Sequence, residues 1–204
     1  MTTRAVFRIV KSNPPSPTIA MLPSRYLTGV RATQLEDFPG VFAAADYRSS
    51  SSSRFVCSYD DGRRHKLRLF QFLARLGQRE ARAEWDLHHV VEGQHFADID
   101  FAGRIRTAYA QELPVVLIHK NEHVAYNQLL HVSATDEMFR DALPDDLVQR
   151  SRAAAASAAR PAERAALRAR VARLAQLYDG AYAGDAILQR IARNVLDDAL
   201  LLLR

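Results

Sequence analysis

Histidine is concentrated in one part of this chain: six of its seven histidines fall between His88 and His131. Two of them are adjacent, in the run WDLHHVVE at residues 85–92. Imidazole titrates close to neutral pH and is the commonest metal ligand in its neutral form. Because adjacent side chains of an extended strand point to opposite faces, one imidazole of this pair can face a metal and the other a substrate phosphate. Such a pair suits phosphodiester hydrolysis, in which a neutral imidazole takes a proton from water and a metal stabilises the developing charge.

A second group of side chains that could bind a metal follows about thirty residues later. The apolar, β-branched run at 114–118 predicts a short buried strand. Asn121 is then a natural N-cap for a helix. On that helix His123 and Asn127 are four residues apart and share one face, which His131 continues. An imidazole and an amide oxygen so placed can supply two ligands to one divalent ion.

These two motifs, His-His-Val-Val-Glu and the later His-x-x-x-Asn, resemble the HNH, or His-Me finger, nucleases. More narrowly, they are similar to the HHIVE-type nucleases found at the C-termini of bacterial polymorphic toxins. The resemblance covers residues 84–132, about a quarter of the chain. It implies a small ββα-metal core, in which a β-hairpin carries the His-His pair and a following helix completes the metal site.

The resemblance also implies a role for each matching residue. His88 is the first metal ligand, His89 the general base, and Glu92 the acidic residue that orients a ring or loop at the catalytic centre. His123 and Asn127 are the helix ligands to one divalent ion, which we expect to be Mg, Mn, Ni or Zn. Further candidates near the site are Asn121, His131 and His119, and the expected nucleic-acid contacts are Arg104, Arg106 and Lys120.

Two of these assignments keep an alternative. Asn121 is the candidate for the family's middle asparagine, but N-capping the helix is its alternative role. His131, one turn beyond Asn127, is the alternative helix ligand. The chain also departs from a minimal finger, because the insert between His89 and His123 is longer and less hairpin-like.

Composition divides the chain into three parts. Residues 1–54 are rich in proline and end in a run of serines, which predicts an irregular N-terminal segment and linker. Residues 55–144 would hold the nuclease core, preceded by a hairpin that turns at Asp60-Asp61-Gly62 and by a helix from Leu69 to about Trp85. Residues 145–204 are expected to form a helical extension. The predicted fold class is therefore α+β, mostly helical, with an N-terminal irregular or β segment, the small ββα-metal core that the resemblance implies, and a C-terminal helical extension.

The helical extension carries its own boundary signals. Pro161 is well placed in the first turn of a helix that runs to Tyr178, and Gly180 and Gly184 interrupt the pattern. Asp185 can cap a last helix with an apolar stripe.

Charge and composition limit the classes of function that this chain can have. The chain has 204 residues, 48% of them apolar, and a single cysteine, which excludes an internal disulfide framework and a CxxC zinc knuckle. The net charge of +5 divides into +7 over residues 1–84, −5 over 85–144 and +3 over 145–204. An acidic centre suits a divalent cation, and basic flanks suit a polyanion.

Partners and location follow from the same patterns. No apolar run approaches the length of a membrane span, and the N-terminus lacks a secretory signal, so we expect synthesis in the cytoplasm with no membrane association. Delivery into a target cell would then need a dedicated secretion system.

The leading hypothesis is a metal-dependent HNH endonuclease, a bacterial toxin or effector that acts on DNA more readily than RNA and has a cognate immunity protein. The alternatives are a noncatalytic HNH-like scaffold in a larger assembly, and a helical interaction protein in which residues 145–204 bind a partner and the histidines are incidental.

Overall fold

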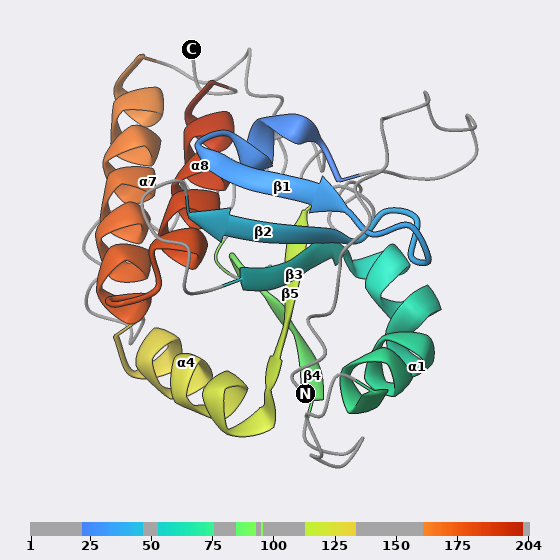
Figure 1. The fold of residues 1–204 in the computed structure, drawn as a ribbon. Coiled ribbons are helices and arrows are strands. Elements are labelled where there is room, and N and C mark those ends of the chain that lie inside the picture. The colour runs from blue at the N-terminus through green and yellow to red at the C-terminus, as the bar shows by residue number, and fades with distance from the viewer. Residues whose placement is uncertain are drawn as a thin grey trace.

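A computed structural model of the chain describes residues 22–46, 53–75, 85–92, 95, 113–133 and 161–201. Among these residues the fold is α+β, as the sequence predicts, with one five-stranded antiparallel sheet (Figure 1). The strands are β1 (Val30–Gln34), β2 (Phe42–Asp46), β3 (Ser53–Ser58), β4 (Trp85–His89) and β5 (Pro114–His119). The described helices are the short 3-10 turn η1 (Ser24–Leu27), α1 (Tyr59–Arg75), α4 (Lys120–Ser133), α7 (Pro161–Ala181) and α8 (Ala186–Leu201).

The strand order is β1-β2-β3-β5-β4, so β5 lies inside the sheet and β4, which carries the His-His pair, forms one edge. The predicted buried strand at 114–118 is confirmed: it is β5, where Pro114 to Ile118 are all buried. Its register places Val116 opposite His88 and Val115 opposite His89. A strand buried on both faces explains the unbroken apolar run, since neither face of β5 meets water.

Helices cover both faces of the sheet. On one face, strand residues such as Val56, Val116 and Ile118 share a core with buried side chains of α7 and α8. On the other face, Cys57, Val115 and Leu117 pack with Leu69 of α1. Figure 1 shows α7, α8 and α4 to one side of the strands and α1 to the other. The pleat of β4 therefore sends its successive side chains into two separate layers.

The hairpin predicted at Asp60-Asp61-Gly62 is wrong, because helix α1 begins at Tyr59 and continues through all three residues. Ser58 caps this helix: its Oγ accepts the Asp61 N–H at 3.1 Å and donates to Asp61 Oδ2 at 2.9 Å. Two acidic residues in the first turn also suit the positive end of a helix dipole. The N-cap at Ser58 thus overrides the turn tendency of Asp-Gly.

Of the two characters expected for the N-terminal segment, irregular or β, the structure shows β where it describes the segment, because β1 and β2 lie there. These strands pair in register from Val30 with Asp46 to Gln34 with Phe42. Strand β2 then pairs with β3, which begins within the serine run at Ser53. Residue 54 therefore lies within a strand of the sheet rather than at the end of an irregular segment. Pairing with neighbouring strands, and not the local residue pattern, makes these segments β.

Most of the C-terminal boundary signals are confirmed, but α7 runs through Gly180 to Ala181, so the interruption expected at Gly180 is wrong. Pro161 begins α7, and Asp185 caps α8 by accepting the Leu188 N–H on Oδ1 at 3.0 Å. Gly184 takes a positive φ of 94° between the two helices. The apolar stripe expected on α8 is buried at Ile187, Ile191 and Val195. No helix among the described residues is long and apolar enough to cross a membrane.

Candidate functional site

Strand β4 directs its two adjacent histidines to opposite faces of the sheet, as the sequence predicts. His88 is completely buried on the side of α4 and α7, with its ring stacked on Tyr126 (centroids 5.5 Å apart). His89 is half-buried on the side of α1 and stacks on Tyr59 at 5.0 Å. The two imidazoles therefore stand in different environments although they are neighbours in sequence.

Helix α4 brings His123 against His88. The centroids of the two rings are 5.0 Å apart, with an interplanar angle of 63°. The contact follows from chain order, because β4 pairs with β5, and β5 runs directly into α4. Asn127 is half-buried one turn later on α4, and His131 lies in the last turn of the same helix. A strand–strand–helix order thus joins two of the three expected ligands, His88 and His123.

His123 is held by a carboxylate that the sequence argument did not single out. Its Nδ1 lies 3.0 Å from Oδ2 of Asp86 on β4. Burial opposes ionisation of Asp86, but its hydrogen bonds from the Leu87 N–H and His123, with Lys66 nearby, lower the pKa overall. Because an ionised carboxylate can only accept, His123 donates from Nδ1, and Nε2 carries the lone pair when the ring is neutral. The available signal was spacing: Asp86 precedes His88 by two residues, so both share one face of β4.

His88 has one nitrogen engaged and one available. Nε2 lies 2.8 Å from the hydroxyl of Tyr182, which follows α7. Nδ1 is buried and has no hydrogen-bond partner among the described residues; Oε1 of Glu92 lies 3.8 Å from it. The sequence analysis expected Glu92 to orient a ring or a loop without naming which one. In the structure the Glu92 carboxylate faces the ring of His88. A buried nitrogen without a partner is unusual in a folded protein and calls for a functional explanation.

Burial keeps both adjacent imidazoles neutral. It lowers the pKa of His88 to about 3, with smaller contributions from His123 and His89. It also lowers the pKa of His89 to about 4, with a contribution from His123. At neutral pH both rings are therefore uncharged, with one N–H and one nitrogen lone pair each. This is the form that binds a metal or accepts a proton.

By their chemistry these donors suit a divalent ion. His88 offers Nδ1, and His123, held by Asp86, offers Nε2; a carboxylate behind a ligating histidine is the usual support of such a ligand. Among the described residues no three His, Cys, Asp or Glu side chains form a group that could hold a metal. The set expected from the sequence has two histidines and an asparagine, so its third ligand is an amide rather than one of those four types.

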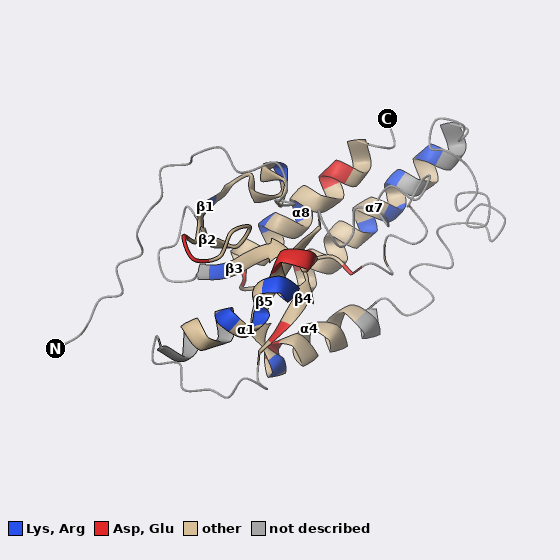
Figure 2. Cartoon of the chain, turned by 90° about the vertical axis from the view of Figure 1, so that its right-hand side faces the viewer, with Lys and Arg blue, Asp and Glu red and all other residues tan. Residues whose placement is uncertain are grey.

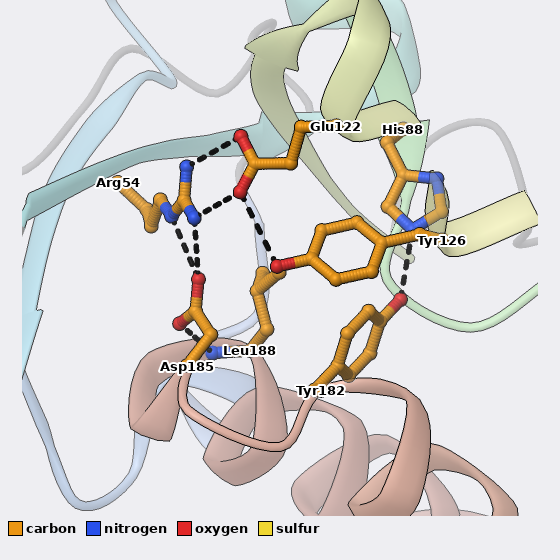
Figure 3. Close-up of polar contacts among 7 residues, drawn as sticks. All are labelled: Arg54, His88, Glu122, Tyr126, Tyr182, Asp185 and Leu188. Atoms are coloured by element: carbon orange, nitrogen blue, oxygen red, sulfur yellow. Dashed lines mark hydrogen bonds and ion pairs between the residues drawn. The ribbon is translucent and has the colours of Figure 1, made fainter. Parts of the chain in front are cut away.

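An ion cluster lies beside Tyr126, the tyrosine stacked on His88, and links the surrounding elements (Figure 3). Arg54 of β3 donates to both carboxylate oxygens of Glu122 on α4, and its Nε lies 2.8 Å from Oδ2 of Asp185. Glu122 also accepts the hydroxyl of Tyr126 at 3.2 Å, the tyrosine stacked on His88. One arginine therefore links the sheet, α4 and the N-terminus of α8 around the site.

The remaining expected site residues have other surroundings. His119 ends β5, and its Nδ1 accepts the Asn121 N–H at 3.2 Å. Because α4 begins at Lys120, the N-cap expected at Asn121 is wrong; His119 precedes the helix, and the exposed Asn121 lies in its first turn. Lys120 is exposed. Arg104 and Arg106 lie outside the described residues, so their expected contacts with nucleic acid stay predictions.

Two further histidines are held within the protein. His95 is buried, with Nδ1 2.6 Å from the hydroxyl of Tyr178. His65 is bonded through Nε2 to the carbonyl of Pro39 at 3.1 Å. Cys57 of β3 is buried, and burial raises the pKa of its thiol.

Comparison with known proteins adds no relative to this description: no family model, no curated protein and no solved structure matches the chain.

Proposed function

We propose that this protein is a metal-dependent endonuclease that hydrolyses phosphodiester bonds of DNA. The observation that carries the proposal is the meeting of His88 and His123, with ring centroids 5.0 Å apart, where β4, β5 and α4 follow one another. Each ring has one nitrogen engaged by the protein and one available for a ligand. Two imidazoles held in this way, each with one nitrogen left for a ligand, favour a metal site over a purely structural pair.

Each residue then has a distinct task. His88, His123 and Asn127 would hold the divalent ion (Mg, Mn, Ni or Zn), which when bound stabilises negative charge on the phosphate and the leaving oxygen. His89, neutral at neutral pH and stacked on Tyr59, would accept a proton from the attacking water. Glu92 would orient His88, since its carboxylate faces that ring at 3.8 Å.

Basic side chains lie on the face of the sheet to which His89 points. Helix α1, whose Tyr59 stacks on His89, also carries exposed Arg63, Arg64 and Arg68. In Figure 2 the Lys and Arg positions along α1 are blue and follow the red acidic positions at the start of the helix. A polyanionic strand lying over α1 would therefore come near the proposed base.

Plasmid cleavage tests the proposal directly. Purified protein incubated with supercoiled plasmid and Mg²⁺, Mn²⁺, Ni²⁺ or Zn²⁺ should convert it to nicked or linear forms, and single-stranded RNA should be cleaved less. His89→Ala should lose cleavage but keep metal binding, whereas His123→Ala should lose both. His65→Gln is the matched control, because Gln can still donate to the Pro39 carbonyl and His65 touches neither proposed ligand.

Either of two results would contradict catalysis: absence of cleavage with every metal, or cleavage by His89→Ala at the wild-type rate. Metal-stabilised folding without hydrolysis would instead support the noncatalytic scaffold. A melting temperature insensitive to chelators and metals would favour the helical interaction protein.

The toxin setting, which rests on the sequence resemblance, has its own test. Expression of the wild-type chain in a bacterium should reduce viability, and expression of His89→Ala to the same level should not. A cognate immunity protein would restore growth and would be acidic where it covers the basic flanks. Equal growth of the two strains would remove the toxin part of the proposal while leaving the nuclease part open to the plasmid assay.

A further inference from the structure

A single hydroxyl group joins the edge strand to the turn that follows α7. The Tyr182 hydroxyl lies 2.7 Å from the carbonyl oxygen of Val90 and 2.8 Å from Nε2 of His88. A phenol has one proton, and a carbonyl oxygen can only accept, so Tyr182 donates to Val90. The second bond must then be donated by the imidazole. This geometry places the ring hydrogen of His88 on Nε2 (Figure 3).

The other nitrogen of His88 consequently carries the lone pair. A neutral imidazole has one N–H, so a hydrogen on Nε2 leaves Nδ1 as an acceptor or ligand. The Glu92 carboxylate, 3.8 Å from Nδ1, would favour the opposite tautomer by accepting an Nδ1–H. Tyr182 and Glu92 therefore compete for the hydrogen of one buried ring.

We infer that Tyr182 is a positioning residue for the proposed metal site: its bond to Val90 fixes the Nε2–H tautomer of His88 and keeps Nδ1 free to ligate. This inference rests on the proposed function. Tyr182 is itself completely buried and packed edge-on against Tyr126 at 4.9 Å, so its hydroxyl has a fixed position. The C-terminal helices are then part of the site rather than an appendage to it.

The tautomer can be read directly, without metal or substrate. In [¹⁵N]-histidine-labelled wild-type protein free of metal, two-bond ¹H–¹⁵N correlation spectra should show His88 with a protonated Nε2 and an unprotonated Nδ1. In Tyr182→Phe, which keeps the buried ring, a population with the hydrogen on Nδ1 should appear. An Nδ1–H tautomer in the wild-type protein would overturn the inference before any variant is made.

Metal affinity supplies the second readout. Calorimetric titration with Ni²⁺ should show binding to Tyr182→Phe about 10- to 100-fold weaker than to wild type, the usual cost of losing a group behind a ligand. Tyr26→Phe is the matched control, because it removes a buried tyrosine hydroxyl bonded to Asp198 of α8, away from His88. Equal Ni²⁺ affinity and an unchanged tautomer in Tyr182→Phe would contradict the inference.

The outcomes also separate this inference from the nuclease proposal. If the tautomer and the Ni²⁺ affinity respond to Tyr182→Phe but no metal supports plasmid cleavage, the positioning role stands and the nuclease proposal fails. If wild type and Tyr182→Phe cleave plasmid equally at limiting Ni²⁺, with equal affinities, the nuclease proposal stands and the positioning role fails.

Discussion

Oδ2 of Asp86 accepts a hydrogen bond from Nδ1 of His123 at 3.0 Å, across 37 positions of sequence. The bond fixes the ring of His123 from behind, as in the carboxylate–histidine pairs that support metal ligands. It also places a negative charge next to an imidazole that would share a cation with His88. Because of this contact, the ring of His123 has a defined orientation beside His88.

Asp86→Asn should weaken Ni²⁺ binding by about 10- to 100-fold, because an amide can donate to Nδ1 and so permit the wrong tautomer of His123. Isothermal titration of the folded variant measures the effect. Asp179→Asn serves as the control, since it disrupts only a surface pair with Arg193, far from β4 in sequence. Unchanged affinity in Asp86→Asn would mean that Asp86 does not support a metal ligand.

Stability of the metal-free protein should fall as the solution becomes acidic. The pKa of His88 is about 3 in the folded protein and near 6.5 in the unfolded chain, so the unfolded state takes up a proton first as pH drops. Stability is therefore complete above pH 6.5 and declines from there towards pH 3. At pH 5 the loss attributable to His88 is about 2 kcal/mol.

Urea unfolding at pH 7.5 and pH 5.0 checks this dependence. The difference in free energy of unfolding between the two pH values should be smaller in His88→Gln than in wild type by about 2 kcal/mol, because glutamine does not titrate. The same difference in both proteins would show that His88 is not buried as a neutral ring.

Removal of Arg54 should destabilise the fold strongly. Arg54→Leu leaves the carboxylates of Glu122 and Asp185 side by side in a partly buried position without their cation. A loss of about 3 kcal/mol is expected from breaking such a cluster. Arg193→Leu, which disrupts the more exposed pair with Asp179, should cost less than about 1 kcal/mol.

A double variant sharpens the Arg54 test. Replacing Glu122 as well, in Arg54→Leu/Glu122→Gln, removes one of the two abandoned charges and should recover part of the lost stability. Chemical denaturation gives the free energy of unfolding of each protein: wild type, Arg54→Leu, the double variant and Arg193→Leu. If the two arginine variants lose equal stability, the cluster around Arg54 contributes no more than an ordinary surface pair.

Two glycines with positive φ should differ in their tolerance of alanine. Gly40 has φ 82°, and a Cβ there would overlap the carboxylate of Asp61, which is buried and bonded to Ser58. Gly184 has φ 94°, but a Cβ there meets nothing within 4 Å. Gly40→Ala should cost about 3 kcal/mol, against about 1–2 kcal/mol for Gly184→Ala, in the same unfolding assay. Equal costs would indicate that the loop at Gly40 moves freely away from α1.

Much of the local structure could be predicted from residue patterns. The apolar, β-branched run before His119 identified β5, because such residues favour a strand and a strand buried on both faces needs continuous apolar side chains. Pro161 and Asp185 marked the starts of α7 and α8, because their effects are confined to a single helical turn. The opposite directions of His88 and His89 followed from the pleat of a strand alone.

Other features could not be predicted from local patterns, because the decisive partners lie far away. The segment containing β1 and β2 looks irregular by itself, and becomes sheet only by pairing onto β3. The turn tendency of Asp60-Asp61-Gly62 gave way to a helix capped by Ser58 and packed beneath the sheet.

By itself the sequence determined which side chains could do chemistry, since it placed two adjacent histidines on a strand and His123 on a later helix. Only the tertiary structure decided which nitrogen of each ring is available. Asp86 engages His123, and Tyr182, 94 residues beyond His88, engages the other ring. The physical reason is that a tautomer is set by the hydrogen-bond partner of the opposite nitrogen, and chain folding alone brings that partner into place.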